Sequence, residues 1–152
     1  MSAVAARLQE LGLALPEVPK PVAAYVPAVR SGSYVHTSGQ LPFVDGTLPE
    51  QGKLGGAVSL ERGVELARIC ALNAIAALAT QVSLDDVVRI VKLVGFVASE
   101  PGFLAQPAVV NGASELLGQV FGGAGEHARS AVGVAVLPLD APVEVELIAE
   151  VR

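Results

Sequence analysis

The chain has 152 residues, which is the size of one domain and enough to bury a sizeable hydrophobic core. Apolar residues make up 52% of it and charged residues 16%, and its net charge is −5 with no Lys/Arg cluster. Because phosphate binding requires concentrated basic charge, we expect no nucleic-acid partner. A small domain this apolar is expected to bury surface against copies of itself.

Cysteine usage and hydropathy indicate a cytoplasmic protein without a membrane partner. The single cysteine, Cys70, cannot form an internal disulfide and has no companion at zinc-ligand spacing. Its neighbours resemble a helix core, which favours a buried structural thiol over a reactive one. The N-terminal segment carries Arg7 and Glu10 within its apolar pattern, unlike a signal peptide. No apolar run reaches the roughly 18 residues of a membrane span.

The first part of the chain predicts a helix, a stiff connector and two strands. Residues 2–13 place Val4, Leu8 and Leu11 at helical spacing, and the Pro-rich residues 16–21 follow as a connector. Within a single domain of residues 1–152, residues 1–16 therefore form a helical extension before a core of residues 21–152. We expect removal of this extension to leave the core intact. Strands are predicted over residues 23–29 and 33–38, with a turn at 30–32.

The remainder predicts two long helices and three strands. Helices are expected over residues 59–80, where Ser59 is a suitable N-cap, and over about 104–117, with a strand at 87–98 between them. Residues 131–137 and 143–151 read as two strands joined by turn chemistry, which predicts a hairpin. The order β-β-α-β-α-β-β favours an α+β fold, a two-layer sandwich with both helices on one face of a mixed sheet.

The candidate site lies at this hairpin, because Arg129 opens an uncharged stretch and Glu144 and Glu146 lie on the returning strand. A guanidinium placed there requires an anion or water. The structural alternative is an ion pair to Glu144 or Glu146, or an Arg that reaches solvent from the strand end. The functional alternative is a fork for a substrate carboxylate, with Glu144 acting on a water molecule. His36 and His127 lack a third ligand, so no metal site is predicted.

Several motifs occur in an order that resembles the RidA/YjgF family of reactive imine/enamine deaminases, also labelled L-PSP endoribonucleases. The C-terminal signature is residues 127–138 (HARSAVGVAVLP) followed by 143–149 (VEVELIA). Upstream, Tyr25-Val26, residues 37–42 (TSGQLP), residues 68–73 (RICALN) and Val110-Asn111 match further family positions. Together these segments cover roughly residues 21–152.

The resemblance implies a chorismate-mutase-like fold and a homotrimer with three clefts between subunits. It implies that Arg129 holds the carboxylate of a 2-imino acid, that Glu144 acts with it in catalysis, and that the other substrate-binding residues are Tyr25, Ser38, Gly39 and Asn111. The implied reaction hydrolyses reactive 2-imino acids, derived from 2-aminoacrylate, to 2-keto acids and ammonia. No metal and no organic cofactor is implied, and the implied partner is the small 2-imino or 2-keto acid.

Some residues depart from the family pattern and indicate a divergent subgroup. Ala131 stands where many members have Cys, His127 replaces a common Pro, and the N-terminal helix and the loop at 42–58 are additional. The main alternative is a non-catalytic metabolite-binding or chaperone-like trimer that uses the same cleft. A chorismate mutase would need several cations for two carboxylates, and only Arg129 is suitably placed. The acidic composition argues against a ribonuclease.

Overall fold

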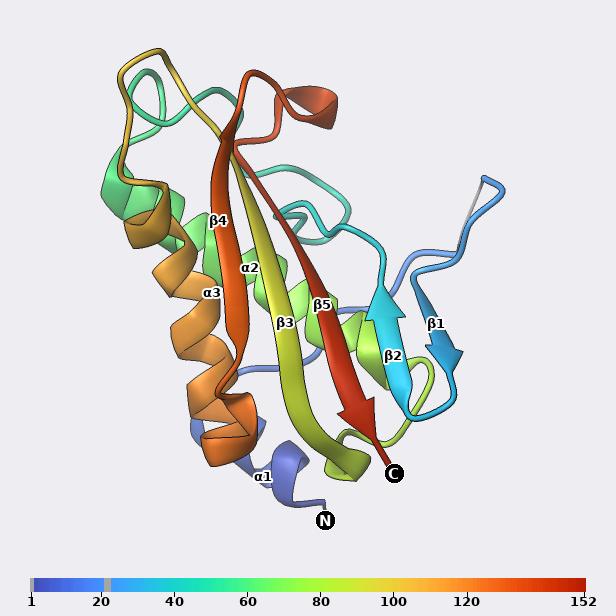
Figure 1. Cartoon of the computed structure of the whole chain (residues 1–152). Coiled ribbons are helices and arrows are strands. Elements are labelled where there is room, and N and C mark those ends of the chain that lie inside the picture. The colour runs from blue at the N-terminus through green and yellow to red at the C-terminus, as the bar shows by residue number, and fades with distance from the viewer. Residues whose placement is uncertain (1, 21–22) are drawn as a thin grey trace.

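The computed structural model describes residues 2–20 and 23–152, and its elements follow the predicted order (Figure 1). The helices and strands are α1 (Ala3–Glu10), β1 (Ala28–Ser31), β2 (Tyr34–Thr37), α2 (Leu60–Ala79), β3 (Val87–Ala98), α3 (Gln106–Phe121), β4 (Ala128–Val134) and β5 (Val143–Val151). Short 3-10 turns lie at Leu84–Asp86, Gly122–Gly125 and Pro138–Asp140. Within the described residues, no helix has both the length and the apolar character needed to cross a bilayer.

The five strands form one mixed sheet in the order β1-β2-β5-β3-β4. The expected hairpin between the last two strands is therefore wrong, because β3 lies between them. β3, α3 and β4 form a crossover unit, which places β4 parallel to β3 at the sheet edge. Residues 135–142 then pass the end of β3, where Ser99 N donates to Val134 O and Ala98 N donates to Pro142 O. β5 joins the other side of β3 in antiparallel pairing.

The boundaries of other elements also differ from the predictions. The first strand runs over Ala28–Ser31 instead of residues 23–29, and Pro27, which has no N–H to donate, precedes it. Pro21 and Val22, at the end of the predicted connector, lie outside the described residues. α3 begins at Gln106, with Pro107 in its first turn, and continues to Phe121. β4 begins at Ala128, so Arg129 is a strand residue rather than the residue before a strand.

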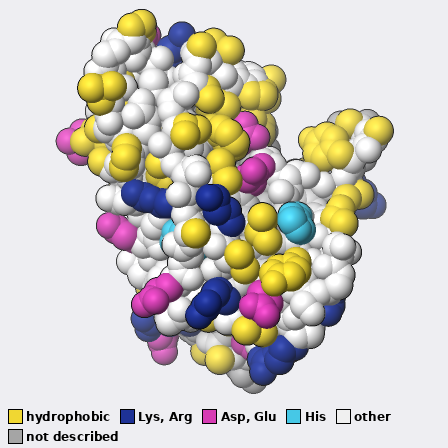
Figure 2. Space-filling view, in the orientation of Figure 1, with side chains coloured by type: hydrophobic (Ala, Val, Ile, Leu, Met, Phe, Trp, Pro, Cys, Tyr) yellow, Lys and Arg dark blue, Asp and Glu magenta, His cyan; other side chains and the backbone are white. Residues whose placement is uncertain are grey.

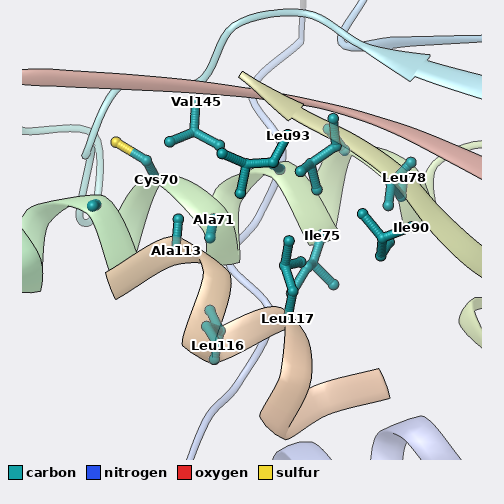
Figure 3. Packing of buried hydrophobic residues seen from close by; sticks show 14 of the residues in the cluster. Cys70, Ala71, Ile75, Leu78, Ile90, Leu93, Ala113, Leu116, Leu117 and Val145 are labelled. Carbon is teal, nitrogen blue, oxygen red and sulfur yellow. The ribbon is translucent and has the colours of Figure 1, made fainter. Parts of the chain in front are cut away.

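α2 and α3 cover one face of the sheet and build the core with it (Figures 1 and 3). Ser59 caps α2 by accepting a hydrogen bond from Arg62 N at 3.1 Å, as predicted. Between the helices and the sheet lie fully buried aliphatic side chains, among them those of Ile75, Leu78, Ile90, Leu93, Leu116 and Leu117. Cys70 is buried in this cluster, and desolvation raises the pKa of its thiol well above the usual range. In the described part of the chain no α-helix covers the opposite face of the sheet, which is termed the open face.

α1 packs onto the same core at the lower end of the sheet. Its Val4 and Leu8 are buried members of the main hydrophobic cluster. Val4 N donates to Asp85 Oδ1 at 3.0 Å, and Arg7 Nε donates to the Gln119 carbonyl at 2.8 Å. These contacts argue against the expectation that residues 1–16 can be removed without loss.

Candidate functional site

Arg129 is anchored by α3 rather than by a carboxylate. Its Nη1 donates to Asn111 Oδ1 at 2.8 Å and to Ser114 Oγ at 3.2 Å, and its Nη2 donates to the Pro107 carbonyl at 3.3 Å. A guanidinium has five N–H donors, and these bonds use three of them. Within the described chain, Nε–H and one Nη2–H have no protein partner. Nε and Nη2 share one edge of the planar group, which is the edge that a carboxylate engages with two parallel bonds.

The close approach of α3 to the sheet places Asn111 beside Arg129. Gly95 of β3 faces α3, and a Cβ built on it would lie 2.5 Å from Cγ2 of Val110. Without that side chain, α3 lies directly on β3, and Asn111 follows Val110 along the helix. Gly95 is also the register partner of Ala131, two residues beyond Arg129 on β4. The sequence match at Val110-Asn111 therefore corresponds to a defined contact with Arg129.

Glu144 lies beside Gly39 on the open face. Gln40 and Val145 exchange backbone hydrogen bonds of 2.8 and 3.0 Å, which holds the segment at Gly39 against β5. A Cβ on Gly39 would collide with Oε1 of Glu144, so glycine leaves the space that the carboxylate occupies. Desolvation, and second the negative charge of Glu146, raise the pKa of Glu144 above its usual value. A half-buried carboxyl group with a raised pKa is suited to accept and return a proton.

Ser38 connects the Tyr25 segment to this group. Its hydroxyl donates to the Val26 carbonyl at 2.7 Å, and its backbone N donates to the Pro27 carbonyl at 2.8 Å. Tyr25 is 64% exposed, and it precedes the residue to which Ser38 is bonded. The structure thus brings together Glu144, Gly39 and Ser38, with the Tyr25 segment tethered next to them.

Arg129 and Glu144 point to opposite faces of the sheet. Arg129 is the register partner of the buried Leu93 and faces the helices, whereas Glu144 alternates with buried neighbours on β5 and faces the open side. β3 separates them by two strand spacings of roughly 4.8 Å, and their register partners Leu93 and Phe96 are three residues, or about 10 Å, apart along it. The structural alternative of an ion pair between Arg129 and Glu144 or Glu146 is therefore not formed. In the described part of the chain Arg129 has no carboxylate partner.

Sequence reasoning missed three residues of the Arg129 network, the first being Pro107, whose carbonyl accepts from Nη2. Ser114 contacts Arg129, and His127 Nε2 lies 2.9 Å from Ser114 Oγ. The spacing of Ser114 three residues after Asn111 was the available signal, since residues i and i+3 share a helix face. The unusual His127 was noted as a departure from the family, but the sequence alone did not link it to Arg129.

A separate hollow lies away from these groups. It measures about 590 Å³, lies between residues 16–19, residues 40–46 and α2, and contains none of the predicted site residues. Gln40, beside Gly39, is one of its wall residues. We assign the candidate site to the Arg129 and Glu144 groups, because they combine unpaired donors with a perturbed carboxyl group.

Comparison with known proteins identifies the family. Residues 5–151 match the family model described as "YjgF/chorismate_mutase-like, putative endoribonuclease". The chain belongs to the YjgF family. Its membership confirms the resemblance inferred from the sequence motifs, and the observed mixed sheet with helices on one face is the expected α+β, chorismate-mutase-like fold.

Individual relatives of this YjgF-family chain are similar over nearly its whole length. Protein TCP17 of Trypanosoma cruzi is 46% identical over 151 residues, which are 98% of this chain and 94% of that protein. The crystal structure of a putative endoribonuclease from Shewanella oneidensis is 36% identical with a TM-score of 0.94, covering 99% of this chain and 100% of that one. The crystal structure of E. coli TdcF with bound serine is 31% identical with a TM-score of 0.60, covering 89% and 93%.

Proposed function

We propose that this YjgF-family protein is an imine/enamine deaminase, which hydrolyses 2-imino acids derived from 2-aminoacrylate to 2-keto acids and ammonia. The observation that carries the proposal is that Nε–H and one Nη2–H of Arg129 have no protein partner in the described chain, while Asn111, Ser114 and the Pro107 carbonyl bind the other three donors. A small 2-imino acid carries one carboxylate, and this edge matches it with two charge-assisted bonds. Serine, the ligand of TdcF, also carries a carboxylate.

The proposed active unit is a homotrimer with its sites between subunits. Arg129 and Glu144 of one chain face opposite sides of the sheet, so one small substrate cannot contact both within that chain. Arg129 lies on the outermost strand, β4, where the open face of a second subunit can meet it. Figure 2 looks onto the open face and shows hydrophobic side chains mixed with scattered basic and acidic ones. A cleft would combine Arg129 of one subunit with Tyr25, Ser38, Gly39 and Glu144 of the next.

The chemistry requires a positioned water molecule and a proton carrier. Arg129 binds the carboxylate and orients C2 of the imine. The substrate reacts as its iminium ion, and Glu144 accepts a proton from water as the new C2–O bond forms, which gives a neutral carbinolamine. Glu144 then transfers that proton to the amine nitrogen, and it takes the hydroxyl proton back as the C2–N bond breaks and the C2 carbonyl forms. The departing ammonia finally carries this proton away as ammonium. One water is consumed, and one ammonium ion and one 2-keto acid are released. Orientation and one carboxyl group suffice for a reaction that also proceeds in water.

The test is an assay with the imine generated in situ from an amino acid by an amino-acid oxidase. Release of the 2-keto acid should be faster with the protein than with buffer or with an Arg129→Ala variant that retains its assembly. Binding of a 2-keto acid without faster release would instead support the non-catalytic metabolite-binding trimer. Failure both to bind and to accelerate would contradict the proposal.

A further inference from the structure

His127 bridges a backbone carbonyl and the helix that anchors Arg129. His127 Nδ1 lies 2.6 Å from the Gly125 carbonyl oxygen, and Nε2 lies 2.9 Å from Ser114 Oγ. Ser114 Oγ in turn accepts from Arg129 Nη1 at 3.2 Å. These contacts form a continuous chain from the guanidinium to the turn at Gly122–Gly125, which precedes β4.

The two ends of this chain fix the direction of its first and last hydrogen bonds, and a neutral His127 fixes the direction of the bond between them. A carbonyl oxygen only accepts, so Nδ1 of His127 carries the hydrogen that binds Gly125. In neutral imidazole Nε2 is then an acceptor, and the Ser114 hydroxyl donates to it. A guanidinium only donates, so Ser114 uses an oxygen lone pair to accept from Arg129. Donation runs in one direction, from Arg129 through Ser114 and His127 to Gly125, and the positive charge at its start polarises each later bond.

A protonated His127 is incompatible with this order. The Nε2–H of a protonated His127 would donate to Ser114 Oγ. Ser114 Oγ would then lie between two cations, Arg129 and His127, and its hydroxyl hydrogen would have no acceptor in the chain. The neutral Nδ1–H form is therefore the one that supports the observed position of Arg129. This assignment depends on the heavy-atom positions of Ser114 on α3, of His127 just before β4 and of Arg129 on β4.

We propose that His127 and Ser114 are positioning residues that set the orientation of the Arg129 guanidinium, so that its Nε–Nη2 edge is presented to a substrate carboxylate. The role in catalysis rests on the proposed function, whereas the orientation itself is a property of the chain. Neither residue needs to contact the substrate. Sequence comparison with the family pattern marks His127 only as a departure, and the hydrogen-bond chain supplies its role.

The first experiment measures binding of 2-oxobutanoate by calorimetry, with the uncharged 2-oxobutanamide as a comparison ligand. Ser114→Ala and His127→Leu should each weaken binding of 2-oxobutanoate about 3- to 10-fold, because each variant removes one hydrogen bond that positions the Arg129 donors. Binding of 2-oxobutanamide should not weaken to the same extent. His127→Gln, whose side-chain oxygen can replace the Nε2 acceptor, should restore much of the affinity. Glu115→Ala, an exposed neighbour on α3, should bind as the unmodified protein does.

A double variant tests whether His127 acts through Ser114. If it does, Ser114→Ala combined with His127→Leu should bind 2-oxobutanoate no more weakly than Ser114→Ala alone. Multiplied losses would show that the two residues act independently. That result would overturn the proposed chain, as would unchanged carboxylate binding in folded His127→Leu.

A spectroscopic measurement separates this inference from the proposed function. The ¹H–¹⁵N signal of Arg129 Nε should be distinct in the unmodified protein and move toward that of a freely rotating arginine in His127→Leu and Ser114→Ala. The ¹⁵N shifts of the His127 ring should report the neutral Nδ1–H form. If the unmodified protein binds no 2-oxobutanoate but these signals behave as stated, the deaminase proposal fails and the orientation of Arg129 stands. An Arg129 signal that is unchanged in both variants overturns the positioning role.

Discussion

Arg129 differs from an ordinary surface arginine in that three of its five donors are bound from one side. Lysine would keep the charge but lose the fork, because an ammonium is a point donor on a flexible stem. We predict that Arg129→Lys fails nearly as badly as Arg129→Ala, with kcat/KM for imine hydrolysis reduced roughly 30- to 1000-fold, or about 2–4 kcal/mol. Steady-state kinetics on variants of verified fold measure this. Normal specific activity of Arg129→Lys would contradict the deaminase mechanism.

Gly39 provides a test of the Glu144 carboxylate position. The atoms that a new Cβ would meet belong to the end of the flexible Glu144 side chain, not to backbone. We therefore predict that Gly39→Ala displaces the carboxylate at small cost, about 1 kcal/mol or less in the free energy of unfolding, while turnover falls about 10- to 100-fold. Thermal unfolding and kcat together check this. Unchanged turnover would show that the Glu144 position is not required.

The raised pKa of Glu144 predicts that Glu144→Gln stabilises the folded protein although it slows hydrolysis. A folded-state pKa above the unfolded-state value means that the folded protein binds the proton more tightly, so this group's contribution to stability falls as pH rises through that window. Above that pH window the ionised, half-buried carboxylate opposes folding. Glu144→Gln should therefore raise the free energy of unfolding at pH 7 more than at pH 4, while slowing hydrolysis about 10²- to 10⁴-fold.

Urea unfolding at both pH values measures this difference, and Glu150→Gln at the far end of β5 is the matched control. A 2-keto acid should still bind to Glu144→Gln, since its carboxylate contacts Arg129. If Glu146→Gln slows hydrolysis more than Glu144→Gln does, the water is handled by Glu146 instead.

At the scale of elements, length and periodicity determined which predictions succeeded. The helix predicted over residues 59–80 agrees with α2 and its caps, and the strands predicted over 87–98 and 143–151 match β3 and β5. Each has an extended, unambiguous pattern of apolar residues. The first strand was misplaced because residues 23–29 are largely apolar, yet Pro27 interrupts them. A local sequence pattern indicates only the propensity to form a strand. A short strand also needs a neighbouring strand whose backbone donors are in register with it.

α1 is an element whose contribution the sequence underestimated. Leu8 is 5% exposed and belongs to the main cluster, whereas Gln9 beside it is exposed. We predict that Leu8→Ala lowers the free energy of unfolding by about 2–3 kcal/mol, while Gln9→Ala changes it by less than about 0.5 kcal/mol. Removing residues 1–15 should destabilise at least as much as Leu8→Ala. Equal urea midpoints for the full and shortened chains would show that α1 does not contribute to the stability of the core.

At the scale of the whole molecule, the partition of the site between two faces could not be obtained from the sequence. Motif matching found Arg129, Asn111, Gly39 and Glu144, but adjacency in sequence suggested that β4 and β5 pair. The order of strands decides which residues share a face, and it depends on where α3 carries the chain. A single inserted strand, β3, separates the two strands of the expected hairpin and places Arg129 and Glu144 in two half-sites.

This partition predicts complementation between inactive variants. If each cleft takes Arg129 from one subunit and Glu144 from another, trimers assembled from equal amounts of Arg129→Ala and Glu144→Gln chains contain some clefts with both residues intact. Random assembly gives both in about one quarter of the clefts, so co-expressed chains should recover about a quarter of the unmodified activity. Homotrimers of each variant, mixed without subunit exchange, are the control. No recovery in verified mixed trimers would place both residues of each site in one chain.

The contacts of α1 also have a consequence for synthesis of the protein. An eight-residue helix is unstable alone, and its partners Asp85 and Gln119 come about 75 and 110 residues later in the chain. At translation rates of 5–20 residues per second, roughly 5–20 s pass between emergence of Leu8 and emergence of Gln119. α1 therefore leaves the ribosome before the segments that it packs against, and it cannot dock until they have emerged. During that interval its apolar residues are available to chaperones, to proteases and to other nascent chains.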